Sequence, residues 1–294
     1  MPDQMSNREH KHKKYRFMLI PAFRLPENSR FANTRNGLPK EQRLMNFAGV
    51  QHLLEDVEWD LHEGALATYG DWAVENREEF LLAGAARLPI VREACESGKY
   101  NALILLGGGE PGYLESREIA RRYGIPVTSC ASAQMHVACM LGNKFSVIDL
   151  AESHNMYYAD VIVRNRFAER CASIRNINYP HPRPSAPEKS PLHAEKMLAL
   201  KGEPSPVVER AVKEAVAAIE EDGAEVITFG CSGIFWLRPF VEKRLKELGW
   251  EVPVIEGYSC AISLAKLYVD MGVDASGLTF PADRPQKSRR KKIV

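Results

Sequence analysis

Two short glycine-containing turns offer groups for chemistry, because each follows an apolar segment and precedes a helical pattern. The first is Gly107-Gly-Gly109, with Glu110-Pro-Gly112 behind it, and the second is Gly230-Cys-Ser-Gly233. A turn of small residues before a helix presents backbone N–H groups, which suit a carboxylate or enolate oxygen. The alternative is that these glycines serve turn geometry alone. The two turns are therefore the first places to look for a site that binds a small anion.

Both turns lie in a repeated unit. Residues 101–112 and 225–234 each have the pattern of an apolar strand, a turn and a helix. Further along, Ile125-Pro-Val-Thr128 follows the first unit and Val252-Pro-Val-Ile255 follows the second. The matching positions predict two related lobes.

Apolar runs alternate with helical patterns along the whole chain, which predicts an α/β fold with parallel sheets and helices on both faces. Ligands of such sheets bind beyond the C-terminal ends of the strands. The proline-rich segment 176–206 is expected to be a connecting loop with one helical turn at 193–199, and long loops of this kind often cover a site. Strands are expected at 15–21, 57–62, 102–106, 127–130, 145–150, 225–229 and 253–256. Helices are expected at 38–56, 71–97 (in two pieces, broken near Gly84 and Pro89), 115–123, 133–141, 155–165, 206–222, 237–248 and 258–271.

Composition narrows the class of protein. Hydrophobic residues make up 45% of the 294 residues and charged residues 26%, which is typical of a globular protein. The apolar runs are too short to span a membrane, no secretory signal is visible, and six scattered cysteines favour a reducing compartment, so the cytoplasm is expected.

Charge is unevenly distributed along the chain. The net charge is +1, but both ends are basic, so the residues between them are acidic. Nucleic-acid binding by the body of the protein is therefore not expected. The segments 1–16 and 281–294 are expected to be flexible basic tails.

An ordered set of motifs between residues 64 and 274 resembles the aspartate/glutamate racemase superfamily, and most closely its hydantoin racemase branch. The resemblance implies two flavodoxin-like (Rossmann-like) lobes related by a pseudo-twofold axis, with the site between them. It places lobe 1 at 17–130 and 255–280, and lobe 2 at 131–254. The motifs are Gly109-Glu-Pro-Gly112, Met135-His136, Met140-Leu-Gly, Lys144-Phe-Ser-Val147, Arg170-Cys-Ala-Ser-Ile-Arg175, Glu220-Glu-Asp-Gly-Ala-Glu-Val-Ile227, Gly230-Cys-Ser-Gly233 and Val252-Pro-Val-Ile-Glu-Gly257.

The resemblance also implies a reaction. Members of the family move a proton at a carbon alpha to a carboxylate or ring carbonyl without a cofactor, using one cysteine on each face of the substrate. Rigid N–H donors stabilise the developing enolate, and a thiol of tuned pKa transfers the proton. Here Cys231 matches the second cysteine, whereas Gly107 occupies the position of the first. His154, at the end of a strand, is the candidate substitute base.

The expected partners are a small-molecule substrate (a hydantoin, an amino acid or a dicarboxylate-like compound) and further copies of the chain in a homo-oligomer. No cofactor is expected, because neither a dinucleotide nor a Walker motif is present, and no metal site is expected from the spacing of the histidines. Arg24 is a candidate to pair with a substrate carboxylate. The residues predicted to contact the substrate are Arg24, Gly108, Gly109, Glu110, Ser132, Ser232, Gly233, Glu256 and Gly257.

Three functions remain open from the sequence. The first is a racemase or epimerase. The second is a cofactor-free decarboxylase of malonate-type acids, in which Cys231 protonates a single face. The third is a ligand-binding protein that kept the fold and lost turnover.

Overall fold

The computed structural model of the chain describes residues 13–31, 37–185, 192–283 and 287. The predicted basic tails at 1–16 and 281–294 therefore lie mostly outside the described residues. Within the described part of the chain, no helix combines the length and the apolar character that a membrane crossing requires.

The first lobe is built on a four-stranded parallel sheet whose strands follow the order β2-β1-β3-β4. Its central strands β1 and β3 are almost wholly apolar and pair in register, with Leu19 opposite Ile104. Both residues are fully buried, as expected for strands covered by helices on both faces. The strands are β1 (Tyr15–Ile20), β2 (Val57–Leu61), β3 (Ala102–Leu105) and β4 (Val127–Ser129).

The second lobe repeats this arrangement. Its three-stranded parallel sheet has the order β6-β5-β7, and a single bridge from Ile227 to Val254 continues it beyond β7. With that bridge, the positions of the second sheet follow the same order as those of the first. The strands are β5 (Phe145–Asp149), β6 (Cys171–Asn176) and β7 (Val226–Phe229). The predicted α/β class with two flavodoxin-like lobes is confirmed.

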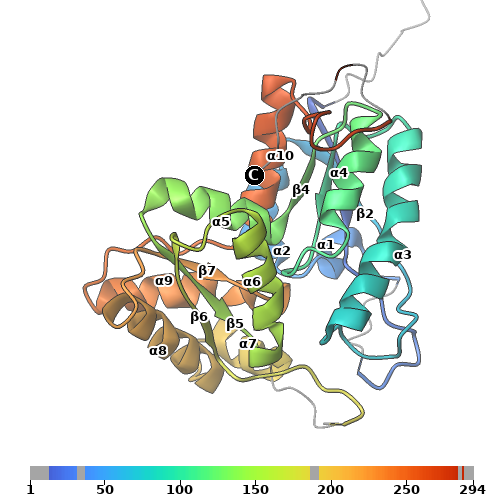
Figure 1. Cartoon of the computed structure of the whole chain (residues 1–294). Helices are drawn as coiled ribbons and strands as arrows, with labels where there is room; N and C mark the ends of the chain where they lie inside the picture. Colours follow the sequence, from blue (N-terminus) through green and yellow to red (C-terminus); the bar gives the residue numbers. More distant parts are fainter. Residues whose placement is uncertain (1–12, 32–36, 186–191, 284–286, 288–294) are drawn as a thin grey trace, which may run out of the picture.

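Two helices exchange places between the lobes. Helix α5 follows the first sheet but also packs on β5 and β7, whereas α10 follows the second sheet and packs on β3 and β4 (Figure 1). The helices are α1 (Lys40–Arg43), α2 (Phe47–Leu54), α3 (Arg77–Glu96), α4 (Tyr113–Arg121), α5 (Cys130–Leu141), α6 (Asn155–Arg164), α7 (Leu192–Leu200), α8 (Pro206–Glu220), α9 (Arg238–Glu247) and α10 (Gly257–Met271), with 3-10 turns η1 (Glu152–His154) and η2 (Ser232–Leu237).

Helix α3 corrects a prediction, since it is one continuous helix and not two pieces. Pro89 lies inside it, and Gly84 does not break it. A Cβ on Gly84 would lie 2.9 Å from the backbone nitrogen of Gly112, so this glycine permits close packing against the start of α4. The start of α3 is fixed by a capping box, in which Asn76 and Glu79 each accept a backbone N–H from the other.

Four further expectations differ from the structure. The segment 38–56 forms two helices, because the chain turns at Asn46, whose φ is 60°. The segment 253–256 makes only the bridge at Val254. Strand β6 was not expected, since its half-polar sequence lacks an apolar run. The single turn expected at 193–199 is the nine-residue helix α7.

Candidate active site

A cavity of about 380 Å³ opens at the carboxyl ends of the strands and is lined by residues of both lobes. Parallel strands of this fold type present their ligand sites at this edge. The predicted site residues that line it are Arg24, Gly107, Gly108, Gly109, His154, Cys231, Ser232 and Gly233.

Cys231 lies directly after β7 and forms the N-cap of η2. Its Sγ accepts a hydrogen bond from the N–H of Gly233 at 3.4 Å and lies 3.7 Å from Nε2 of His181. Its own N–H donates to Oδ1 of Asp149 at 2.7 Å, which fixes the turn. Burial, together with the nearby Asp149 carboxylate, raises the pKa of the Cys231 thiol to about 12. At neutral pH the resting side chain is therefore an uncharged thiol.

The turn after β3 carries no functional side chain. A Cβ on Gly108 would lie 2.1 Å from the carbonyl oxygen of Gly230, and one on Gly109 would lie 2.8 Å from the ring of Phe80. The two glycine-containing turns therefore approach each other backbone to backbone. Gly107 has a φ of 111°, which L-residues rarely adopt, and a Cβ there would meet Ala22 at 3.1 Å.

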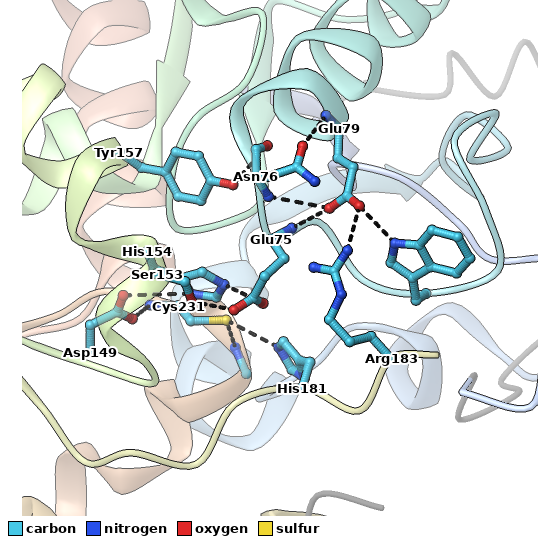
Figure 2. Close-up of polar contacts among 12 residues, drawn as sticks. Glu75, Asn76, Glu79, Asp149, Ser153, His154, Tyr157, His181, Arg183 and Cys231 are labelled. Carbon is cyan, nitrogen blue, oxygen red and sulfur yellow. Dashed lines mark hydrogen bonds and ion pairs between the residues drawn. The ribbon is translucent and has the colours of Figure 1, made fainter. Parts of the chain in front are cut away.

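His154 lies between two carboxylates that come from different lobes (Figure 2). Its Nε2 is 3.2 Å from Oε2 of Glu75, and its Nδ1 is 3.5 Å from Oδ2 of Asp149. Although burial opposes its charge, these two contacts raise the pKa of His154 to about 10. Ser153 donates a further hydrogen bond to Glu75. At neutral pH, His154 is an imidazolium, so it is poorly suited to the role of substitute base.

The proline-rich segment delivers a second histidine to the cavity. His181 contacts Cys231, and two residues later Arg183 pairs with Oε1 of Glu79 at 2.8 Å (Figure 2). Since Glu79 belongs to α3 of the first lobe, this segment crosses from one lobe to the other. Burial and the nearby His154 charge lower the pKa of His181 to about 4. His181 is therefore a neutral imidazole beside a neutral thiol.

Arg24 lies on the first-lobe wall, where its backbone bridges to Leu66. Arg43 also lines the cavity, while its Nη2 donates to the carbonyl of Leu61 at 3.2 Å. The wall between them is largely apolar, with the side chains of Phe23, Leu25, Phe31, Leu44 and Met45. The cavity thus combines an apolar surface with two guanidinium groups.

Four predicted binding residues lie outside the cavity lining. Glu110 is buried, forms an ion pair with Arg164 and accepts hydrogen bonds from Ser132. Glu256 is buried and accepts two backbone N–H groups at the start of α10, both at 2.8 Å. A Cβ on Gly257 would lie 2.5 Å from the Cβ of Cys130, so this glycine permits close packing. These residues therefore stabilise the structure around the cavity and do not line it.

Arg87 is a fully buried cation beneath the first-lobe wall. Its guanidinium donates to the carbonyls of Ile20, Pro21, Leu106 and Pro111, and none of these acceptors is a carboxylate. Burial lowers the pKa of Arg87 to about 10, so the group is charged at neutral pH. One side chain therefore ties the turn after β1 to the turn after β3.

No group of three or more His, Cys, Asp or Glu side chains in the described ranges is arranged to hold a metal ion. The titratable residues that line the cavity include Cys231, the histidines His62, His154 and His181, and the arginines Arg24 and Arg43.

The sequence model of the Asp/Glu/hydantoin racemase family matches residues 70–265. The chain belongs to this family. Membership makes it an enzyme of the isomerase class and confirms the family predicted from the ordered motifs.

Curated relatives within the racemase family are hydantoin racemases. That of Pseudomonas sp. (strain NS671) is 28% identical over 194 residues, which are 65% of this chain and 68% of the relative. That of Rhizobium meliloti is 28% identical over 181 residues, 62% of this chain and 65% of the relative. The chain thus spans about two thirds of the length of these relatives.

Solved structures share the racemase fold. Allantoin racemase from Klebsiella pneumoniae superposes with a TM-score of 0.67 at 20% identity, covering 95% of this chain and 97% of that one. A liganded double mutant of arylmalonate decarboxylase, with a glycine changed to cysteine and a cysteine to serine, gives a TM-score of 0.54 at 13% identity. It covers 87% of this chain and 92% of that one.

Three residues of this racemase-family site were missed from the sequence, namely Glu75, Arg87 and His181. Glu75 and Arg87 lie in or beside an ordinary helical pattern, and nothing local distinguishes them. His181 had a signal, because it stands between two prolines in the segment predicted to cover the site.

Proposed function

We propose that the chain is a cofactor-independent racemase or epimerase that moves a proton at the carbon alpha to a carboxylate or hydantoin carbonyl, with Cys231 as the thiol acid/base. The observation that carries the proposal is the position of Cys231, on the wall of an inter-lobe cavity and next to the glycine turn of the other lobe. Hydantoin and allantoin are five-membered cyclic ureides, and the names of the relatives support a substrate of this class.

The reaction needs hydrogen-bond donors that stabilise an enolate oxygen, and the cavity wall contains such groups. Removing an alpha proton builds negative charge on the carbonyl oxygen, and fixed donors lower the barrier without reorganising. The lining contains candidate donors, namely backbone N–H groups of the two turns and the side chains of Arg24 and Arg43. The apolar surface around them excludes water and strengthens these interactions.

The roles follow from position. Arg24 binds a carboxylate or ring oxygen, and residues 107–109 and 232–233 frame the reacting carbon. Glu110, Ser132, Glu256 and Gly257 act indirectly by holding the walls. We further propose a homo-oligomer in the cytoplasm, a location supported by the absence of disulfides among the cysteines, all six of which are free.

The test is hydrogen exchange in deuterated water. Each enantiomer of several 5-substituted hydantoins, of allantoin and of several amino acids is incubated with the protein. Loss of the alpha-proton NMR signal and loss of optical rotation are both followed. Exchange that disappears in the Cys231→Ser variant is expected, and the absence of exchange with every compound contradicts the proposal.

A second function is favoured by one specific observation. Gly107 stands where a second thiol is expected, and its φ of 111° disfavours any side chain. A single protonated thiol is the group that a decarboxylase needs, because loss of carbon dioxide generates the carbanion and only a donor is required. Release of carbon dioxide from aryl- or alkylmalonates, giving one product enantiomer, decides for this function. Exchange of hydantoin alpha protons decides for the first.

A further inference from the structure

The cavity has a cationic end, formed by two arginines of the first lobe. Arg24 follows β1, Arg43 is the last residue of α1, and both are half-buried in the cavity lining. Among the described residues, no hydrogen bond or ion pair engages the Arg24 guanidinium. Arg43 donates from Nη2 to the carbonyl of Leu61 at 3.2 Å, and within the same part of the chain no carboxylate pairs with it. Most N–H donors of the two guanidinium groups are therefore available to a ligand.

His62, which directly follows β2, lies near both arginines and adds a neutral donor to the cavity lining. Burial lowers the pKa of His62, and the two guanidinium charges lower it further, so the ring is uncharged at neutral pH. Its Nδ1 accepts the N–H of Gly64 at 2.9 Å. Since a backbone N–H can only donate, the proton of the neutral ring lies on Nε2, which is then a donor.

The carboxylate in this part of the lining is that of Glu63, which is exposed. Its charge and that of Glu93 on α3 act on His62 in the direction opposite to burial and to the guanidinium groups. Two cations and one anion leave this end of the lining with a net positive charge. A field of this sign favours an anionic group on the ligand.

The order of the strands separates the cationic end from the thiol. In the order β2-β1-β3, the arginines lie at the ends of β1 and β2, whereas the turn of Cys231 meets the turn after β3, at Gly108. Neighbouring strands are about 4.8 Å apart, so the ends of β2 and β3 are about 10 Å apart. An acidic group bound by the arginines therefore lies several bonds away from a carbon beside Cys231.

The cavity is large enough for a substrate that reaches both ends. Its volume of about 380 Å³ is that of roughly a dozen molecules of liquid water. A bare five-membered ring fills only part of this space. Apolar side chains line the same first-lobe wall, among them Phe23 and Leu44, and they suit an aliphatic or aromatic chain that extends from the ring.

These donors lie in a part of the chain that the racemase family model does not match. Arg24, Arg43 and His62 all precede residue 70, where the match begins. Family membership therefore does not account for them. When a shared fold carries different wall residues, those residues are suited to selecting different substrates.

We propose that Arg24 and Arg43 form a subsite for a carboxylate at the far end of the substrate's substituent, so that the enzyme prefers hydantoin-type rings whose apolar side chain ends in an acid. A planar guanidinium presents paired N–H donors that match the two oxygens of a carboxylate, and His62 supplies a further N–H. This inference rests on the proposed function. It selects the carboxylate role for Arg24 and leaves the enolate oxygen to the backbone N–H groups.

The experiment compares matched pairs of 5-substituted hydantoins. Both members of a pair have the same straight alkyl chain, which ends in a carboxylate in one and in a primary amide in the other, and the series varies the chain length. Isothermal titration calorimetry measures Kd for the wild type, Arg24→Gln, Arg43→Gln and the double variant. Arg92→Gln, at an exposed position of α3 outside the cavity lining, is the matched control. Circular dichroism and thermal unfolding verify that each variant is folded.

At the chain length that fits, the wild type and Arg92→Gln are expected to bind the acid about 100-fold more tightly than the amide. Each single variant is expected to lose about tenfold of this preference, and the double variant nearly all of it, with little change in amide binding. Unchanged amide binding shows that the cavity is intact. The proposal is overturned if no acid binds more tightly than its amide, or if the preference survives in the folded double variant.

A second arm follows exchange of the alpha proton of the same compounds in deuterated water. Arg24→Gln is expected to raise KM for the acid about tenfold with little change in kcat, because the group it binds is remote from the reacting carbon. If the wild type exchanges acid and amide equally well, this inference fails and the proposed function stands. If the acid binds through the arginines and no hydantoin is exchanged, the proposed function fails and the subsite stands.

Discussion

The turns after β3 and after β7 occupy the same place in two lobes of the same strand order, yet only one of them carries a reactive side chain. In the first turn, the close approach of Gly108 to Gly230 and of Gly109 to Phe80 leaves no space for a Cβ. In the second turn, Cys231 has an ordinary extended backbone, with φ of −64° and ψ of 133°. The first turn thus offers only backbone groups to the cavity, whereas the second also carries a thiol.

The two turns are also held in place by side chains of opposite charge. The second turn is held by Asp149, which is itself within 3.5 Å of a charged histidine. The first turn is held by Arg87, a cation that donates hydrogen bonds to the backbone carbonyls of Leu106 and Pro111. The two turns therefore share a place in the fold but differ in backbone conformation, in side chains and in the groups that hold them. The following predictions test this asymmetry.

The largest effect is expected at the sulfur. Cys231→Ser replaces the transferred S–H with a hydroxyl of much higher pKa, so turnover of any active substrate should fall about 1000-fold. The fold should be retained, since the side chains are similar in size. Steady-state kinetics measure the loss, and Cys139→Ser, a change far from the cavity on α5, serves as the control. Retained activity in Cys231→Ser would contradict the proposal that Cys231 transfers the proton.

The next effect is on stability. Gly108→Ala forces a methyl group against the carbonyl of Gly230, so the free energy of unfolding should fall by about 3 kcal/mol. Gly223→Ala is the matched control, because its φ of 77° is also positive but nothing lies within 4 Å of its added Cβ. It should cost about 1 kcal/mol. Urea titration compares them, and equal losses would mean that the contact between the turns is unimportant.

The His154 ion pairs should make stability depend on pH. The folded-state pKa of about 10 exceeds the ordinary value of 6.5, so the stabilisation is complete below pH 6.5 and disappears as the pH rises through 10. His154→Gln should therefore lower the free energy of unfolding by about 2–4 kcal/mol at pH 6. Denaturation curves of the variant and the wild type should converge above pH 10. A constant difference across this range argues against a charged His154.

The smallest effect is expected at Gly107. An alanine there adopts an unfavourable φ and meets Ala22, which should cost about 1–2 kcal/mol in the free energy of unfolding. Gly107→Cys carries the same strain, so it should gain little second-thiol activity. Urea titration and the exchange assay measure the two quantities. A stable Gly107→Cys variant with faster racemisation than the wild type would contradict this expectation, because it would show that the first turn can also hold a functional thiol.

The fold could be predicted from the sequence because short local patterns identify most of its strands and helices. Apolar strands such as 102–105 and 226–229 are recognisable by themselves, and the repeated turn motif ordered them into two lobes. Helix α3 was wrongly divided because Gly84 and Pro89 are helix-breaking types, while the reason for Gly84 is its contact with α4. The position of Cys231 in a small-residue turn also followed from local pattern.

The rest of the site was not accessible, because its contacts join distant residues. Glu75 and His154 are 79 positions apart, and Cys231 and His181 are 50 apart. Their charge states depend on burial and on each other, which no spacing rule contains. Glu110 and Glu256 were predicted to touch the substrate, but the structure places them as buried hydrogen-bond acceptors behind the walls.

The return of α10 to the first lobe has a consequence for synthesis. Its residues Ala261, Ile262 and Ala265 are fully buried in the same core as Leu19 and Ile104, and Ala261 accepts a hydrogen bond from Thr128 at 2.9 Å. While the ribosome is still making the second lobe, the part of the first sheet that α10 covers, at β3 and β4, lacks this helix. The half of the protein that emerges first is thus the last to be completed, and a nascent chain that stalls before α10 exposes an apolar surface that chaperones bind.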